Sequence, residues 1–541
     1  MRGTSQRSVV IIGGGISGLA SAALLARDGY DVDLVEARDG FGGRAGRWER
    51  DGFRFDTGPS WYLMPEVFDH FFHLLGTSAA EQLDLERLDP GYRIFFEGHA
   101  DPIDISASAT ENMERFEAVE AGAGHRLGRH LDSAQRTYDI AVERFLYTSF
   151  DSARPFLSAE VVRRGPRLMQ LLLESLESFV ARRFHDPRLR QVLGYPAVFL
   201  GSSPDRTPSL YHLMSSLDLT GGVQYPHGGF AALIDAMVDL ARASGARLHA
   251  GTPATRIVTA PGGPGRARAT ARGVQVRDPA GEERTLDADV VVATADLHHV
   301  ETTLLPRPLQ TYPESWWRRR TSSPGGVLVM LGIRGELPRL PHHTLLFTRD
   351  WSANFGAIAD GRVPSPASTY VCKPSATDSS VAPPGHENLF LLVPAPADPA
   401  LGHGGEDGAG SSAVERIADE AIEQLGRWAG VGDLSDRVVV RRTVGPADFR
   451  DDLGAWRGGI LGPAHTLRQS AFFRAGNASR RVGSLYYAGS STIPGIGLPM
   501  CLISAEVLLK RLRGDRSPSP LRTPMSPSPS HRPPPEGTIR S

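Results

Sequence analysis

A short glycine-rich stretch near the start of the chain has the spacing of a phosphate-binding turn. Gly13-x-Gly15-x-x-Gly18 follows the β-branched run Ser8–Ile12 and leads into the Ala- and Leu-rich segment Ile16–Arg27, an order that predicts a strand, a tight turn and a helix. Gly13 permits the sharp turn, Gly15 lets a pyrophosphate approach the backbone, and Gly18 lets the helix pack closely on the strand. Unpaired N–H groups and a partial positive charge at the helix N-terminus then attract the phosphates.

An acidic residue, Glu36, follows the second predicted strand, where a nucleotide-binding unit commonly has one. Glu36 closes a second predicted strand, Asp31–Val35, and a carboxylate at that point can accept hydrogen bonds from the ribose hydroxyls of an adenosine. A glycine-rich turn in an ordinary α/β domain does not account for this acid. The stretch 8–36 therefore predicts a dinucleotide-binding βαβ unit of a parallel sheet.

A second glycine-rich turn lies toward the other end of the chain. Ser484–Ala488 predicts a strand, residues 489–499 are rich in glycine, and Met500–Arg513 predicts a helix. The start of that helix offers N–H donors and a positive dipole end, which suit a ring that gains negative charge on reduction. A turn with a purely structural role is the alternative interpretation.

The composition excludes several classes of protein. The chain has 541 residues, of which 40% are hydrophobic and 22% charged, which is typical of a globular protein with more than one domain. Lys and Arg total 59 against 61 for Asp and Glu, so the net charge of −2 provides no field that attracts nucleic acid. No run of about 18 apolar residues predicts a membrane-spanning helix.

Metal and disulfide chemistry are not expected. The cysteines Cys372 and Cys501 are too few for a structural zinc site or a disulfide framework, and such a low content is typical of a reducing environment. The pairs His298-His299 and His342-His343 are expected at the surface or at helix ends rather than as ligands. The sequence therefore predicts no metal site.

Several sequence blocks are spread from residue 9 to residue 510: VVIIGGGISGL, GGRAGRWERDGFRFDTGPSW, YPHGGFAALIDAM, ADVVVATADLHHV and YYAGSSTIPGIGLPMCLISAEVLL. They resemble the bacterial and fungal type of phytoene desaturase, in the carotenoid and retinoid oxidoreductase family. The Tyr-Pro-x-Gly-Gly and Thr-x-Pro-Gly-x-Gly patterns are more specific than the first glycine turn. The resemblance implies FAD as the cofactor, bound by Gly13, Gly15, Gly18, Glu36, Gly43, Arg44, Gly58, Ile257, Gly489, Gly495, Gly497 and Leu498.

The chemistry of that family does not require a strong catalytic base, and the sequence offers no clear candidate for one. Desaturation removes a hydride from an allylic carbon and a proton from its neighbour, and the resemblance implies that flavin N5 accepts the hydride while quinone or oxygen takes the electrons. Because the polyene delocalises the positive charge left behind, a strong base matters less than a dry, well-placed substrate. By resemblance, Glu160 and Arg163 are the acidic and basic residues near the flavin, although related desaturases have Asp at the first position and Arg where this chain has Ala159. A solvated charge pair at a helix start is the alternative.

A long hydrocarbon substrate must come from a membrane. The apolar segment Leu168–Leu173 follows Arg163, Arg164 and Arg167, a pattern typical of a helix that lies at a membrane surface and equally of a core helix. We therefore expect a cytoplasmic enzyme that is peripherally associated with the inner face of the cell membrane.

The expected fold class is α/β, with a Rossmann-type FAD-binding domain assembled from discontinuous segments and an α+β substrate domain that bears a helical, membrane-facing part. The FAD-binding domain is expected to comprise residues 1–75, 225–300 and 470–513. The substrate domain is expected to comprise residues 76–224 and 301–469. Residues 514–541 are rich in Pro, Ser and Arg and predict a disordered tail.

Other functions share the same motifs. The FAD blocks also fit other flavoenzymes that act on carotenoids (a ketolase, an aldehyde-forming oxidase, an isomerase or a saturase), and they fit an amine oxidase. The same fold serves as a non-catalytic lipid-carrying escort of prenylated small GTPases, but such proteins tend to lose the phosphate glycines, which are intact here. A desaturase of phytoene or a related acyclic polyene is the favoured interpretation.

Overall fold

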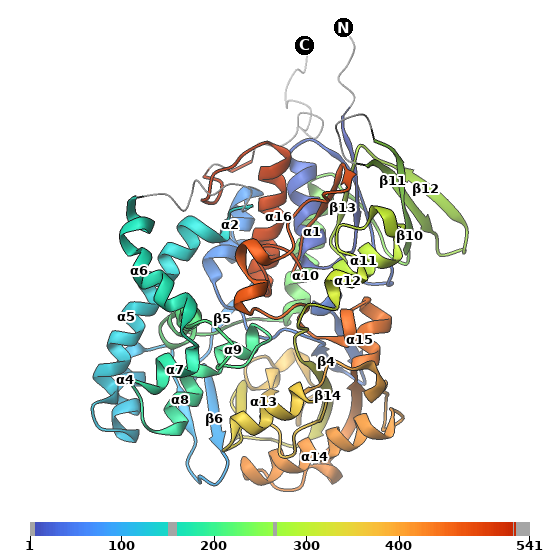
Figure 1. Cartoon of the computed structure of the whole chain (residues 1–541). Helices are drawn as coiled ribbons and strands as arrows, with labels where there is room; N and C mark the ends of the chain where they lie inside the picture. Colours follow the sequence, from blue (N-terminus) through green and yellow to red (C-terminus); the bar gives the residue numbers. More distant parts are fainter. Residues whose placement is uncertain (1–5, 150–158, 263–267, 523, 526–541) are drawn as a thin grey trace, which may run out of the picture.

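The computed structural model describes residues 6–149, 159–262, 268–522 and 524–525 (Figure 1). Two large sheets organise this part of the chain. In Figure 1 a parallel sheet lies in the upper half of the view and a mixed sheet in the lower half, with a group of helices along the left side.

The parallel sheet has five strands in the order β20-β13-β1-β2-β9. Strands β1 (Ser8–Ile12) and β2 (Asp31–Val35), with helix α1 (Ile16–Arg27) between them, have the predicted bounds, so the predicted βαβ unit is confirmed. The other strands are β9 (Arg247–His249), β13 (Val290–Ala293) and β20 (Leu485–Tyr487). The sheet thus joins segments that are far apart in the sequence, as a discontinuous nucleotide-binding domain requires, while the exact domain limits stay a prediction.

One face of the parallel sheet is covered by helices. Every residue of α1 from Ile16 to Ala26 is buried, because α1 packs on the sheet below it and between two neighbouring helices. The helices on this side are α1, α2 (Pro65–Leu74), α10 (Phe230–Ala243) and α16 (Leu498–Leu512).

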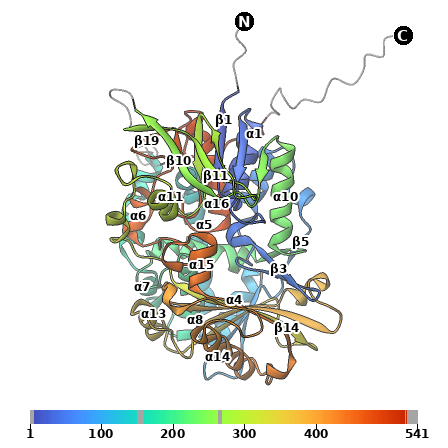
Figure 2. The ribbon, with the colours of Figure 1, turned by 90° about the vertical axis from the view of Figure 1, so that its right-hand side faces the viewer.

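A smaller sheet covers the other face and is seen at the top of Figure 2. Its core includes Val10 and Val291 of the parallel sheet together with Ile257 and Trp317. The elements on this side are β10 (Ala254–Pro261), β11 (Ala269–Arg277), β12 (Glu283–Asp287), β19 (Val482–Gly483), α11 (Leu297–Thr303) and α12 (Glu314–Trp317).

The mixed sheet has seven strands in the order β18-β14-β17-β16-β15-β6-β7, of which β15 and β6 run parallel and the other neighbours antiparallel. Helix α14 packs on one of its faces. The elements are β6 (Tyr92–Phe96), β7 (Ile103–Ile105), β14 (Gly325–Arg334), β15 (His343–Phe347), β16 (Thr369–Cys372), β17 (His386–Ala395), β18 (Val438–Val444), α13 (Trp351–Ala359), α14 (Ser412–Trp428) and α15 (Pro446–Leu453).

A group of helices flanks both sheets, and none of the helices in the described part of the chain is long and apolar enough to cross a membrane. Two short antiparallel pairs, β3 with β4 and β5 with β8, complete the fold. The remaining elements are α3 (Ala79–Gln82), α4 (Ala109–Val119), α5 (Ala123–Ala141), α6 (Ala159–Leu173), α7 (Leu176–Ala181), α8 (Pro187–Gly194), α9 (Pro196–Phe199), β3 (Arg47–Arg50), β4 (Phe53–Asp56), β5 (Leu85–Arg87) and β8 (Gln224–Pro226).

Part of the predicted tail packs against the helices. The Lys510 Nζ atom donates to the carbonyls of Ser517 and Ser519 (2.7 Å each). Met525 is buried, and its N–H donates to the carbonyl of Leu74 (3.0 Å). The expectation of disorder therefore does not describe these residues, because Leu521 and Met525 supply the apolar side chains that cover α2 and α16.

Candidate functional site

The turn between β1 and α1 has the conformation that its glycines predict. Gly13 has a φ of +106°, and its N–H donates to the carbonyl of Val35 (2.9 Å). A Cβ atom at Gly18 would lie 1.9 Å from the carbonyl oxygen of Gly13, so glycine is needed for α1 to begin this close to β1. At Gly15 a Cβ would meet nothing nearer than 3.7 Å, which leaves room for a ligand to approach the backbone.

Glu36 lies at the end of β2 and is 8% exposed. One carboxylate oxygen accepts the N–H of Gly14 (2.6 Å) and the other accepts the N–H of Arg38 (3.0 Å). Because each carboxylate oxygen has a second lone pair, the anchored side chain can still accept hydrogen bonds from ligand hydroxyls. This is the place that the sequence predicts for a ribose-binding acid.

A second loop lies directly on the first turn. The N–H of Gly42 donates to the carbonyl of Gly14 (2.9 Å), and a Cβ at Gly58 would lie 1.9 Å from the carbonyl oxygen of Arg44. The Nη2 atom of Arg44 lies 3.5 Å from Oδ2 of Asp296. Within the described structure, Nε and Nη2 of Arg44 and Oδ2 of Asp296 are buried without a hydrogen-bond partner. Unpartnered buried groups of this kind are costly, so they point to a polar ligand beside Arg44.

The second glycine-rich turn reaches the same place from the other end of the chain. Gly489 has a φ of +118°, and its N–H donates to Oγ of Ser504 on α16 (3.0 Å). Helix α16 follows Gly497 and begins at Leu498, slightly before the predicted start, because Pro499 is well tolerated in a first turn. The Ser17 hydroxyl of α1 donates to the carbonyl of Cys501 (3.3 Å), which ties the two helix starts together.

Arg474 holds this turn, and its role could not be predicted from the sequence. Its guanidinium is buried and donates to the carbonyls of Thr492 (2.9 Å), Gln469 (3.3 Å) and Pro463 (3.4 Å), and also to that of Ser490. Burial lowers the pKa of Arg474 to about 10. No motif marks the residue, since its partners are main-chain carbonyls and it is one of many arginines in the chain.

His465 is a second positioning residue that the sequence does not reveal. Its Nε2 atom accepts the N–H of Ile496 (3.2 Å), and its Nδ1 atom lies 3.1 Å from the Tyr211 hydroxyl. Burial holds the pKa of His465 well below its usual value, so the ring is neutral. A Cβ at Gly495 would lie 2.2 Å from Nε2, which explains the glycine at that position.

Both glycine turns, Glu36, Arg44 and His465 line one cavity of about 890 Å³. Predicted residues that line it are Gly13, Gly15, Glu36, Gly43, Arg44, Gly58, Gly489, Gly497 and Leu498. Aromatic side chains form another part of the lining. They are Trp61, Tyr195, Phe199 of α9, Phe347 of β15, and Trp351 and Phe355 of α13. The nucleotide-binding groups and a broad aromatic wall therefore share a single space, as a site for a cofactor and an apolar substrate requires.

Some predicted residues lie elsewhere. Gly18 and Gly495 do not line the cavity. They allow close packing behind its lining, Gly18 against Gly13 and Gly495 against His465. Ile257 is buried in the core rather than lining the cavity, because its place on β10 turns it away, and Pro253 and Ala254 line the cavity instead. Glu160 and Arg163 fall on α6, but their side chains lie outside the described residues.

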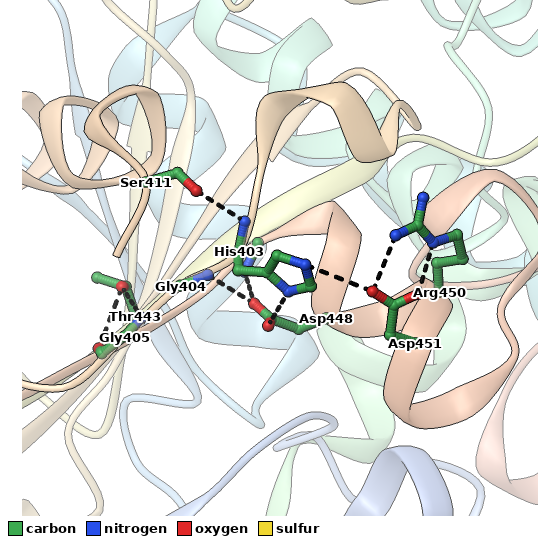
Figure 3. Close-up of polar contacts among 9 residues, drawn as sticks. His403, Gly404, Gly405, Ser411, Thr443, Asp448, Arg450 and Asp451 are labelled. Atoms are coloured by element: carbon green, nitrogen blue, oxygen red, sulfur yellow. Dashed lines mark hydrogen bonds and ion pairs between the residues drawn. The ribbon is translucent and has the colours of Figure 1, made fainter. Parts of the chain in front are cut away.

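Helix α15 forms another part of the wall through Arg450, Asp451 and Asp452. Figure 3 shows how it is held: Nδ1 of His403 lies 2.9 Å from Asp448 and Nε2 lies 3.4 Å from Asp451. Arg450 and, to a lesser extent, His403 lower the pKa of Asp451. This polar cluster anchors the first turn of α15 through Asp448 and reaches the cavity wall at Asp451.

The prediction that His342 and His343 lie at the surface or at a helix end is wrong. Both are buried, because β15 is an inner strand of the mixed sheet. Nδ1 of His342 lies 2.8 Å from the Thr377 hydroxyl, and Nδ1 of His343 lies 2.8 Å from the Tyr370 hydroxyl. These histidines and Cys372 offer ligand atoms within 4.8 Å of one another, so the absence of a metal site stays a prediction.

The geometry defines a class of protein. A parallel sheet and two glycine turns from opposite ends of the chain surround a cavity with an apolar wall. An acid at the end of β2 and Arg44, which pairs with Asp296 but has buried nitrogens without a hydrogen-bond partner among the described residues, also line it. This is the arrangement of a dinucleotide-dependent oxidoreductase with an attached substrate domain.

Comparison with known proteins specifies the family. The model for flavin-containing amine oxidoreductases matches residues 16–506. The chain belongs to this family and, within it, to the carotenoid desaturases, and it is an FAD-dependent oxidoreductase. The predicted family, enzyme class and cofactor are confirmed.

Three curated relatives illustrate the similarity. The carotenoid 3,4-desaturase of Haloarcula japonica is 39% identical over 94% of this chain and 98% of its own. The zeta-carotene-forming phytoene desaturase of Myxococcus xanthus is 34% identical over 94% of each chain. The phytoene desaturase of Fusarium fujikuroi is 30% identical over 94% of this chain and 90% of its own.

Solved structures share the fold at low sequence identity. An oxidoreductase from Methanosarcina mazei has a TM-score of 0.59 at 16% identity, covering 93% of this chain and all of its own. Putrescine oxidase has a TM-score of 0.58 at 15% identity, covering 94% of this chain and 99% of its own. These likenesses bear out the mixed α/β fold.

We expect the stability of the protein to fall as the pH rises toward and through neutral, in part through Asp56. This residue ends β4, and its carboxylate accepts the N–H groups of Phe230 (2.8 Å) and Ala231 (3.2 Å) at the start of α10. Burial raises its pKa to about 7. Since an unfolded Asp titrates near about 4, the folded protein binds this proton more tightly. The stabilisation is therefore complete below about pH 4 and is lost as the pH rises through about 7.

The measurement is the temperature at which bound flavin is released, at about pH 6 and about pH 8. Asp56→Asn keeps an acceptor oxygen but cannot titrate, so the difference between the two temperatures is expected to shrink. Asp235→Asn, at an exposed position on the same helix, is the matched control. An undiminished difference in Asp56→Asn would contradict the assignment.

Proposed function

We propose that the protein introduces C=C bonds into an acyclic carotenoid, phytoene or a related polyene. The observation that carries this proposal is the single cavity in which the cofactor-binding groups adjoin a wall of aromatic and aliphatic side chains. The names of the similar proteins support it, and that of the relative from Haloarcula japonica favours desaturation at the 3,4 position.

When bound, FAD supplies the acceptor of the hydride that leaves the substrate. The residues of the chain provide the surroundings for that step. Trp61, Phe199 and Phe347 exclude water and align the polyene, so that its reacting carbons are held in one position. His465 does not act as the base in this arrangement, because its neutral ring already accepts the N–H of Ile496.

The product profile tests the proposal. Purified holoenzyme is given phytoene, a less saturated acyclic carotenoid or an amine, with a quinone under anaerobic conditions or with oxygen, and the products are separated by chromatography. We expect polyenes with a longer conjugated system and a requirement for quinone or oxygen. Ketones, aldehydes, isomers, more saturated products or amine oxidation alone would overturn the proposal.

Glu160 is proposed to assist the loss of the proton. If it does, Glu160→Gln should bind FAD normally and lose most of its turnover, because the amide cannot take up a proton. The measurement pairs flavin absorbance with the rate of product formation. Unchanged turnover would show that Glu160 is only part of a solvated charge pair, and Glu177→Gln on α7 serves as the control.

We further propose that the protein attaches peripherally to a membrane through α6. In this helix Leu171 is buried, whereas Met169 and Leu173 are 55% and 70% exposed, so α6 has both a buried apolar side and an exposed apolar side. The double variant Met169→Ser/Leu173→Ser should float with liposomes several-fold less than the parent. Val439→Ser, on the outer strand β18 of the mixed sheet, is a matched exposed apolar control. Equal flotation of all three proteins would contradict the attachment.

A further inference from the structure

A second pocket, of about 600 Å³, lies among helices α5, α6 and α7. We call it the arginine pocket, because its lining includes Arg126, Arg129, Arg136, Arg167 and Arg183, together with His130. No Asp or Glu is among the described residues that line it. Such a concentration of positive charge in a concave space attracts anions.

The charge of the arginine pocket is only partly neutralised by the surrounding protein. Arg126 pairs with Glu120, but its Nε atom is buried and has no hydrogen-bond partner in the part of the chain that the structure describes. Arg183 lies 3.8 Å above the Phe179 ring, and its pKa is lowered by burial first and then by Arg167 and Arg182. Glu174 acts in the opposite direction, so the positive charge of Arg183 is balanced in part and not in full.

His130 adds a polar side chain to the lining of the arginine pocket. It is 2% exposed, and its Nε2 atom lies 3.2 Å from the Ser215 hydroxyl. Its Nδ1 atom is buried and finds no hydrogen-bond partner among the residues described. Burial and the adjacent His212 hold the pKa of His130 well below its usual value. An unpartnered nitrogen on a buried ring is a second, independent sign that the pocket accommodates a polar ligand.

We propose that the arginine pocket binds the phosphate group of an anionic phospholipid. The planar guanidinium groups match the oxygens of a phosphate in bidentate fashion. Arg167 lies on the same helix as the exposed Met169 and Leu173, so the cationic pocket and the apolar surface are neighbours. That combination complements the headgroups and acyl chains of an anionic membrane.

The position of the arginine pocket beside the large cavity gives the lipid a role in desaturation. This part of the inference rests on the proposed function. Helix α5 separates the arginine pocket from the large cavity. Arg136, Thr137 and Ile140 line the first, while Tyr138 and Ala141 line the second. A headgroup held on one side of α5 would therefore keep the wall of the substrate cavity at the membrane surface.

Binding to vesicles tests the proposal in the full-length holoenzyme. Co-sedimentation is measured with vesicles of phosphatidylcholine alone and with vesicles that also contain phosphatidylglycerol. The double variant Arg129→Gln/Arg136→Gln is expected to bind the phosphatidylglycerol vesicles about tenfold more weakly and the neutral vesicles as the parent does. The matched control, Arg416→Gln/Arg427→Gln, removes two charges from α14, which lies away from α5 and α6 in Figure 1.

Two further arms separate the outcomes. Calorimetric titration with inorganic phosphate tests the pocket without a lipid, and turnover of detergent-dispersed polyene tests the proposed function without a membrane. Arginine-dependent binding to phosphatidylglycerol vesicles supports the inference, even if the desaturation assay fails. Vesicle binding that the double variant leaves unchanged overturns it, as does binding of inorganic phosphate by a parent protein that shows no preference for phosphatidylglycerol.

Discussion

Replacing Gly18 by alanine is expected to leave the protein without bound FAD and to lower its turnover at least about 100-fold. The alanine Cβ would lie 1.9 Å from the carbonyl oxygen of Gly13 and 2.9 Å from the Thr294 hydroxyl oxygen. Helix α1 must then move away from β1, and its N-terminal N–H groups leave the position where they meet the pyrophosphate. Absorbance of the purified protein at flavin wavelengths and the rate of product formation measure the effect.

Gly40→Ala provides the control for that experiment. Gly40 lies just before the loop that contacts the same turn, and a Cβ there would meet nothing within 4 Å. We expect this variant to bind flavin as the parent does. If Gly18→Ala also retained a full complement of flavin, the role assigned to the β1–α1 turn would be wrong.

Replacing Arg474 by methionine is expected to produce the second large effect. Methionine fills much of the space but leaves the carbonyls of Thr492, Ser490, Pro463 and Gln469 without their charged donor. Breaking such a buried network costs about 3 kcal/mol or more. Since a chain of this length loses about 1 kcal/mol of stability per degree near its midpoint, flavin should be released roughly 3–5 °C lower.

The comparison for this prediction is Arg468→Met. Arg468 lies a short distance before Arg474 in the sequence and is exposed. The same change of side chain should therefore leave the temperature of flavin release nearly unaltered. Flavin fluorescence during heating reports both variants. Equal release temperatures for the two variants would show that the glycine turn at Gly489 does not depend on the buried guanidinium.

The sequence predicts the nucleotide-binding part of the fold closely, because local signals there agree with the tertiary structure. The run Ser8–Ile12, the glycine turn and the segment Ile16–Arg27 each have a clear period or spacing, and the elements form with those bounds. Glu36 could be placed because the end of a parallel strand determines where its side chain lies. These features are set within a few dozen consecutive residues.

Features that depend on distant parts of the chain could not be predicted. Arg474 is defined by its carbonyl partners and not by neighbours in the sequence. The aromatic wall combines Phe199 of α9, Phe347 of β15 and Trp351 of α13, which come together only in the folded protein. Ile257 does not line the cavity for a related reason: the sequence identifies the strand, but the packing of the smaller sheet decides which of its residues face the cavity. Its role toward the cofactor stays a prediction.

The arrangement of the parallel sheet has a consequence for synthesis of the protein on the ribosome. Strand β20 pairs with β13 of the middle of the chain, and α16 packs against α1 of its beginning, so the C-terminal segment completes structure formed by earlier parts of the polypeptide. A nascent chain that has not yet released residues 485–512 exposes the apolar flanks of β13 and α1. Such an intermediate is a natural client for chaperones, and the cofactor can be loaded only after translation has passed that stretch.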